Sequence, residues 1–190
     1  GNLSFALCKV GFEVIGVDYK GNKDRPVVKT IWLDLASKSG QKAFWQLVTK
    51  LGSRLKFVHM GPPCGSASLA RNIRRKNPDG SPAKVDPKPL RSYLYPDGLP
   101  GLKWSDKERI RTANLLYAFC VEVAIYLCRR GIAWTLENPT NSLLWDTSWF
   151  QRLAELKRQA LLLYNRVSMQ MCMHGGSRPK KSDEIYAGRI

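Results

Sequence analysis

The first 60 residues alternate between strand-like and helix-like spacings of apolar positions. A short helix is predicted before Gly11, followed by a strand at 13–18 and a β-branched run at 27–35. Residues 41–52 place their apolar side chains on one helical face and end at a glycine, which predicts a second helix. Residues 55–60 (LKFVHM) form the next predicted strand.

The apolar pattern disappears between about Arg71 and Trp104, where prolines and Asp-Gly turn signals are frequent. A loop of this length inside a compact domain is usually functional or disordered. Ser105 is the expected N-cap of a long helix that Gly131 ends. The elements expected after it are a strand at 132–137, a helix at 148–163 and strands at 164–171 and 183–190.

This order of elements predicts the fold class. Strands that alternate with helices at such spacing favour one α/β domain over residues 1–190, with a doubly wound, mostly parallel sheet covered on both faces. Ligands bind such sheets beyond the carboxyl ends of the strands. The residues expected there are Asp18, Asp34, Gly61 to Cys64 and Glu137 to Asn141.

The net charge of the chain indicates a class of partner. The 190 residues include 31 Lys and Arg against 15 Asp and Glu, a formal net charge of +16 that favours a polyanion. Charge alone does not separate DNA from RNA or from an anionic membrane surface. No uninterrupted apolar run of about 20 residues occurs, and the first residues lack the order of a signal peptide. We therefore expect no membrane-spanning helix and an intracellular protein, nuclear in a eukaryote and in the cytoplasm or nucleoid of a bacterium or phage.

The cysteines argue against a structural role in disulfides or metal binding. Five of them are scattered along the chain without a CxxC pair, and only two histidines are present. We therefore expect no metal site and mostly plain core thiols.

Cys64 is the exception, because it follows two prolines at the end of a predicted strand, in GPPCGSAS. Proline fixes φ, so the thiol is held in one direction at the mouth of the sheet. It is a candidate nucleophile if neighbours such as Arg71 and Arg74 favour its thiolate. The alternative is a turn cysteine buried behind the proline bend, and these residues alone leave both interpretations open.

Acidic residues close three predicted strands. Glu137 ends IAWTLE and starts ENPTN, and it must lie in water, in an ion pair or in a site, because burying a lone carboxylate is unfavourable. Asp18 ends a strand that follows a Gly-Asn-Leu-Ser segment and a helix, where nucleotide-binding βαβ units place the acid that holds ribose hydroxyls. Asp34 is a weaker example at the next strand end. The alternative for each is a solvated strand end.

Taken in order, three segments resemble the motifs of the cytosine-5 DNA methyltransferase family. GNLSFALCKVGFEVIGVD resembles the end of the cofactor loop and the acid-ended strand after it. GPPCGSAS resembles the catalytic-cysteine motif, and ENPTN resembles the Glu-Asn-Val-x-Asn motif. The resemblance implies a Rossmann-like, S-adenosylmethionine-dependent methyltransferase fold. Because it begins inside the cofactor loop, we expect the family's first strand to be missing from the sheet.

The resemblance also implies roles for individual residues. Cys64 would attack C6 of a cytosine flipped out of the stack, so that C5 takes the methyl group of S-adenosyl-L-methionine, and Glu137 would contact the ring N3 and the exocyclic amine. The segment at about 65–104 would be the basic loop that closes over DNA. Implied cofactor contacts are Gly1, Leu3, Ser4, Asp18, Asp34 and Pro62. Implied nucleic-acid contacts are Ser68, Arg71, Arg74, Arg75, Lys76 and Asn141.

The chain departs from the family pattern at several points. Gly65 stands where glutamine is common and Pro139 where valine is usual, and neither the arginine pair before the last strand nor a target-recognition region is evident. We expect target recognition to come from a further segment or a separate partner. Three alternatives stay open: a degenerate methyltransferase-like domain that only binds nucleic acid, the same chemistry on an RNA cytosine, and an amino-methyltransferase acting on adenine N6 or cytosine N4. The last has no need of ENPTN.

Overall fold

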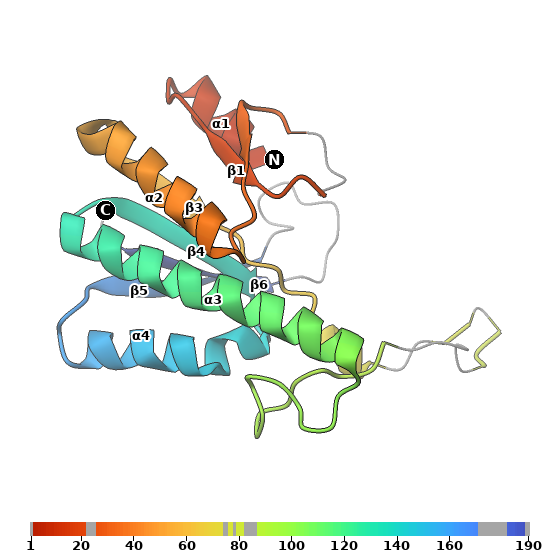
Figure 1. Cartoon of the computed structure of the whole chain (residues 1–190). Coiled ribbons are helices and arrows are strands. Elements are labelled where there is room, and N and C mark those ends of the chain that lie inside the picture. Colours follow the sequence, from red (N-terminus) through yellow and green to blue (C-terminus); the bar gives the residue numbers. More distant parts are fainter. Residues whose placement is uncertain are drawn as a thin grey trace. The chain divides into compact units, whose positions relative to one another are not determined.

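The protein has a mixed α/β structure with short parallel strands in two small sheets (Figure 1). The chain divides into two compact units, Gly1–Arg54 and Leu55–Ile190. The computed structural model describes residues 2–21, 26–73, 76–77, 79–81, 87–170 and 182–188.

The first unit holds two helices and one pair of parallel strands. Its elements are α1 (Asn2–Lys9), β1 (Gly16–Asp18), β2 (Thr30–Trp32), α2 (Lys38–Leu51) and the short 3-10 helix η1 (Gly52–Arg54). Gly11 ends the first helical segment with φ 91°, as expected from the sequence. The hydroxyl of Ser37 accepts from the Gly40 N–H at 3.0 Å and caps α2. The predicted strands at 13–18 and 27–35 are reduced to three residues each, because each finds one partner and pairs only over that length.

The second unit carries a four-stranded sheet. Its strands β3 (Phe57–Met60), β4 (Ala133–Pro139), β5 (Tyr164–Gln170) and β6 (Ser182–Gly188) lie in the order β3-β4-β6-β5. β3 and β4 are parallel, with Met60 opposite Leu136, whereas β6 is antiparallel to both β4 and β5. β3, β4 and β5 therefore point in one direction, and β6 alone is reversed. The sheet is mixed because the last strand, β6, lies antiparallel between β4 and β5.

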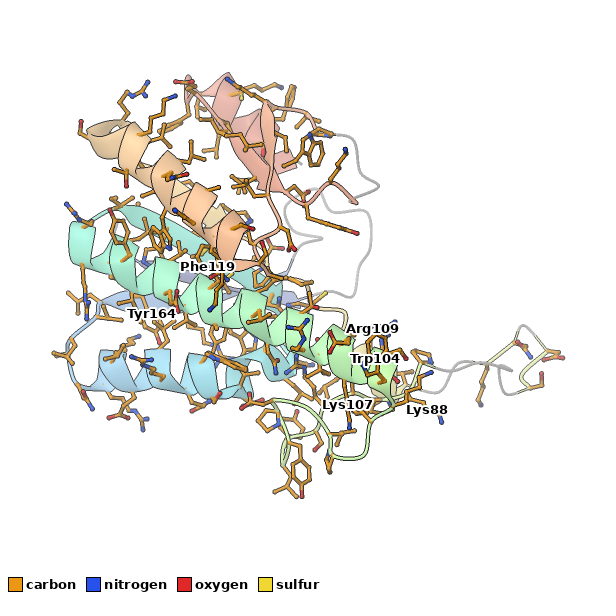
Figure 2. The ribbon with its side chains drawn as sticks, viewed as in Figure 1. Lys88, Trp104, Lys107, Arg109, Phe119 and Tyr164 are labelled. Carbon is orange, nitrogen blue, oxygen red and sulfur yellow. The ribbon has the colours of Figure 1, made fainter. Side chains whose placement is uncertain are left out.

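Helix α3 (Trp104–Arg130) packs on β4 and β6 and beside α4 (Ser148–Arg158). β4 alternates strictly: Trp134, Leu136 and Asn138 are buried, and the residues between them are half-buried. Figure 2 labels two core aromatics, Phe119 on α3 and Tyr164 on β5, which are 3% and 6% exposed. The buried face of β4 therefore supplies much of this core.

By length and composition, α3 is a helix that would be able to cross a membrane, which the sequence pattern did not lead us to expect. The same helix buries 44% of its most apolar stretch inside the protein, and its neighbours α4 and the sheet cover it. This packing is typical of a core helix.

Two predicted helix ends are wrong. Ser105 is not the N-cap of α3, because the N–H groups of Asp106 and Lys107 both donate to the Lys103 carbonyl, so that Lys103 is the N-cap and helical bonding starts two residues earlier. α4 ends at Arg158 and not at 163, because Ala160 adopts a positive φ of 55°. The predicted end of α3 at Gly131 is confirmed, with φ 66° in the left-handed region.

Candidate functional site

The thiol of Cys64 lies outside the core at the carboxyl end of β3. Pro62 is buried, whereas Cys64 is exposed and makes no disulfide. The Cys64 carbonyl accepts from the N–H groups of Ala67 and Ser68 at 3.0 and 2.8 Å, which closes a tight turn behind it. The prolines and this turn hold the thiol at the surface, so the alternative of a buried turn cysteine does not hold.

Two further described cysteines of the second unit, Cys120 and Cys128, are half-buried. Burial raises the pKa of the Cys120 thiol to about 12, and burial also raises the pKa of the Cys128 thiol. Both therefore stay protonated and unreactive at neutral pH. Cys8 is exposed, but it lies on α1 in the first unit. Cys64 is the exposed thiol of the second unit among the residues that the structure describes.

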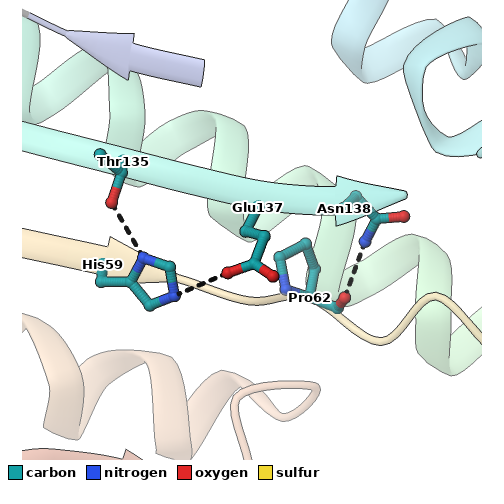
Figure 3. A network of polar contacts seen from close by, with 5 residues as sticks. All are labelled: His59, Pro62, Thr135, Glu137 and Asn138. Atoms are coloured by element: carbon teal, nitrogen blue, oxygen red, sulfur yellow. Dashed lines mark hydrogen bonds and ion pairs between the residues drawn. The ribbon is translucent and has the colours of Figure 1, made fainter. Parts of the chain in front are cut away.

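A buried amide ties the cysteine loop to β4. Asn138 is 2% exposed, and its Nδ2 donates to the Pro62 carbonyl at 2.9 Å (Figure 3). Burial makes this bond important, because an unpaired buried carbonyl is costly. Since Asn138 directly follows Glu137, the bond joins the cysteine segment and the ENPTN segment at one end of the sheet.

Two further bonds hold the loop on either side of Cys64. The phenol of Tyr117, which is fully buried on α3, donates to the Pro63 carbonyl at 2.8 Å. Burial raises the pKa of Tyr117, so the phenol keeps the proton that it donates. Arg91 Nη2 donates to the Ser66 hydroxyl at 3.2 Å. Hydrogen bonds from α3 and from the loop before α3 therefore hold the residues on either side of Cys64.

Arg91 is a buried cation that organises this loop. It is 2% exposed, and its guanidinium donates to the Pro96 carbonyl at 2.7 Å and to Asn114 Oδ1 at 2.8 Å. It also lies 5.1 Å from the centre of the Tyr117 ring, a cation–π contact. Burial lowers the pKa of Arg91, and the nearby Tyr117 and Asp97 oppose that shift. The segment 87–103 therefore is not a loose loop where it meets α3.

Replacing Arg91 by alanine is expected to destabilise the protein by about 3 kcal/mol or more, because it leaves a cavity and several buried polar groups without partners. The matched control is Arg109→Ala, which removes an exposed cation 3.8 Å from Asp106 and is expected to cost at most about 0.5 kcal/mol. Urea unfolding followed by circular dichroism measures both. Equal stabilities of the two variants would show that Arg91 does not hold the loop.

Glu137 shares one face of the sheet with His59 and Thr135. His59 pairs with Thr135 in the parallel register, and its Nδ1 lies 2.9 Å from the Thr135 hydroxyl. His59 Nε2 lies 3.7 Å from Glu137 Oε2, which is an ion-pair distance but longer than a hydrogen bond (Figure 3). The side chains of His59 and Glu137 are 29% and 34% exposed. Glu137 thus ends neither in bulk water nor in a buried pair, but at a partly open position beside an imidazole.

Burial lowers the pKa of His59 below its ordinary value of 6.5, which makes stability depend on pH. In the unfolded chain His59 binds a proton at its ordinary pKa, whereas in the folded protein it binds one only at lower pH. The protein is therefore expected to become less stable as the pH falls below 6.5, with no such loss above that pH. His59→Gln is expected to lose less unfolding free energy than the wild type between pH 7 and pH 5. Urea titrations at both pH values test this, and equal losses would contradict it.

The expected cofactor residues of the first unit occupy strand and helix ends. Asp18 is the last residue of β1, and its Oδ1 accepts from the Tyr19 N–H at 2.7 Å. Asp34 lies two residues beyond β2, and its Oδ1 accepts from the Ala36 N–H at 3.0 Å in the turn before α2. Leu3 and Ser4 lie in the first turn of α1 and not in a loop, and Gly1 lies outside the described residues.

The expected nucleic-acid contacts differ in how they are held. Arg71 is turned back onto its own loop, where its guanidinium donates to the carbonyls of Lys88 at 2.9 Å and Gly65 at 3.2 Å. Ser68 caps the 3-10 helix η2 (Leu69–Asn72) and forms an isolated antiparallel β-bridge with Ser142, which lies just beyond ENPTN. Lys76 and Asn141 are exposed. Arg74 and Arg75 lie outside the described residues.

The comparisons with known proteins give no family. No protein-family model, no curated protein and no solved structure matches the chain. Within the described ranges, no group of three or more His, Cys, Asp or Glu side chains is placed to hold a metal ion. His59, Tyr117 and Arg91 are the site residues that sequence reasoning missed, and only the polar His59 inside an apolar strand gave a signal that would have located one of them.

Proposed function

We propose that this chain is the catalytic core of a cytosine-5 DNA methyltransferase that uses S-adenosyl-L-methionine. The observation that carries the proposal is the junction of the two motifs. Cys64 is exposed on a loop whose Pro62 carbonyl is bonded by Asn138, the residue after Glu137. An exposed thiol just beyond β3 and a carboxyl group near the end of the adjacent parallel strand β4 suit chemistry on a base.

The sheet order supports the doubly wound, Rossmann-like fold that the motif resemblance implies. β3, β4 and β5 run in one direction, and β6 alone is reversed between β4 and β5, so the sheet keeps a mostly parallel character. In the first unit, the parallel pair β1 and β2 has Asp18 at the carboxyl end of β1, where a nucleotide-binding unit places its acid.

The residues present fit the cofactor by their chemistry. The carboxylate of Asp18 ends a strand in the position suited to ribose hydroxyls, and Asp34 follows the next strand with a carboxylate suited to an amine. When bound, S-adenosyl-L-methionine would supply an electrophilic methyl group. Leu3 and Ser4 in the first turn of α1 complete the proposed set within the first unit.

In the proposed reaction the Cys64 thiolate forms a bond to C6 of the flipped cytosine, and the electron pair of the C5–C6 double bond becomes available at C5. Glu137 contacts the ring N3 and the exocyclic amine, and so stabilises the charge that develops on the ring. Once C5 carries the methyl group, a solvent water takes the C5 proton, the electron pair of that C–H bond restores the C5–C6 double bond, and the Cys64 sulfur leaves C6 as a thiolate. Asn138 and Tyr117 hold the loop that carries the thiol throughout.

Identification of the methylated atom tests this proposal. The protein is incubated with DNA and S-adenosyl-L-methionine carrying a labelled methyl group, and the DNA is digested to nucleosides. Label in 5-methyl-2′-deoxycytidine is the expected result. Label on the N4 amine or on adenine would replace the proposal by an amino-methyltransferase, and DNA binding without label would favour a binding-only domain.

A further inference from the structure

A cavity of about 280 Å³ lies beside the segment that follows Glu137, near the lower end of the size range of ligand sites. Thr140 and Asn141 line it from the turn after β4, and Gln151 lines it from α4. Arg166 of β5 and Tyr93 of the loop before α3 also line the cavity. None of these side chains takes part in the proposed methyl transfer. The motif resemblance assigns Asn141 to nucleic-acid binding.

The polar groups of this cavity match the edge of a nucleobase. Asn141 and Gln151 carry amides, which present a donor and an acceptor side by side, as base edges do. The Gln151 amide is fixed because its Nε2 donates to the Trp145 carbonyl at 3.1 Å. The Thr140 hydroxyl oxygen is buried, so the exposed amides of Asn141 and Gln151 are the polar groups that a base edge in the cavity would meet.

Tyr93 provides an aromatic ring on a rigid support. Its side chain is 70% exposed, although the backbone around it is held by reciprocal bonds between Ser92 and Tyr95, at 3.3 and 3.1 Å. The adjacent Arg91 is buried and anchors the same turn. An exposed aromatic ring on a fixed turn is suited to stacking on a base.

Charge complements this arrangement. Arg166 and the acidic Asp146 both line the cavity, and a guanidinium there suits a phosphate or the O6 and N7 acceptors of guanine. Burial raises the pKa of Asp146, and the proximity of Arg166 opposes that shift. With a formal net charge of +16, the chain as a whole attracts a polyanion.

We propose that this cavity is a nucleoside subsite that holds the nucleotide next to the target cytosine and reads its base. The position beside the cytosine rests on the proposed function. Asn141 is four residues beyond Glu137, so the two lie at most about 13 Å apart at about 3.3 Å per residue, within reach of a neighbouring nucleotide. The subsite would give this chain base discrimination of its own.

The test uses the 190-residue chain and single-stranded DNA oligonucleotides that contain one cytosine and differ only in the base beside it. Fluorescence anisotropy is expected to show at least about 5-fold discrimination among the four bases, the lower limit for one good amide–base pair. Tyr93→Ala is expected to weaken binding of the preferred oligonucleotide by at least about 5-fold, through loss of stacking. Asn141→Ala is expected to reduce discrimination to less than about 2-fold.

The matched control is Tyr95→Ala, which removes a half-exposed tyrosine from the same turn but not from the cavity lining. It is expected to bind like the wild type. Equal affinities for the four oligonucleotides, or equal effects of Tyr93→Ala and Tyr95→Ala, would overturn the subsite. The same oligonucleotides made with 5-fluorocytosine separate the two proposals. A covalent adduct without base preference rejects the subsite alone, whereas base-selective binding without an adduct supports the subsite and rejects the methyl-transfer chemistry.

Discussion

Cys64→Ala is expected to lose all detectable methyl transfer to DNA while its dissociation constant for DNA stays within about 2-fold of the wild type. Alanine cannot form the bond to C6 without which C5 is not nucleophilic. The exposed position of Cys64 means that its replacement leaves no cavity, so stability is expected to change by about 0.5 kcal/mol or less. Transfer of a labelled methyl group and fluorescence anisotropy measure the two properties in parallel.

Cys8→Ala is the matched control, because Cys8 is the other exposed thiol among the described residues. It is expected to keep wild-type methyl transfer. Unchanged transfer by Cys64→Ala would reject the nucleophile, and loss of both transfer and DNA binding would show that Cys64 serves the fold or the interface instead.

Glu137→Gln is expected to slow methyl transfer by about 10²- to 10⁴-fold with little change in DNA affinity, the range seen when a proton-transferring group is removed. The amide keeps the size of the side chain, but it cannot exchange a proton with N3 as the ring gains charge. The variant also alters the contact with His59, whose Nε2 lies 3.7 Å from the carboxylate. Single-turnover transfer at saturating DNA measures the effect.

Glu122→Gln provides the comparison, since Glu122 is an exposed carboxylate on α3 within the same unit. It is expected to react at the wild-type rate. A rate for Glu137→Gln that equals the rate for Glu122→Gln would remove Glu137 from the chemistry and leave it as a partner of His59.

The order of helices and strands was largely predictable, because each element carries its own local signal. Residues 41–52 show helical spacing and, apart from the closing Gly52, lie within α2, and Gly11 and Gly131 mark helix ends through positive φ angles. Strand pairing was not predictable in the same way. The reversed β6 enters between β4 and β5, and nothing in the apolar pattern of a strand specifies the direction of its neighbour.

The candidate site was predictable only where a motif marked it. Cys64 and Glu137 were expected at strand ends next to proline-containing segments. Cys64 follows the end of β3 by four residues, but Glu137 does not close its strand, because β4 continues to Pro139 through pairing with β6. The bonds that hold the site join residues far apart in sequence. Arg91 reaches Ser66 across 25 residues, and Tyr117 reaches Pro63 across 54. Such partners depend on tertiary packing, so composition and periodicity contain no sign of them.

The most direct test of the central claim is covalent trapping. The protein is incubated with S-adenosyl-L-methionine and DNA that contains 5-fluorocytosine, whose C5 fluorine cannot leave as the proton does, and the mixture is then denatured. We predict an adduct between protein and DNA that survives denaturation, that maps to Cys64 by mass spectrometry and that is missing in Cys64→Ala. Absence of an adduct from folded protein that binds both DNA and S-adenosyl-L-methionine would contradict the assignment of this chain as a cytosine-5 methyltransferase.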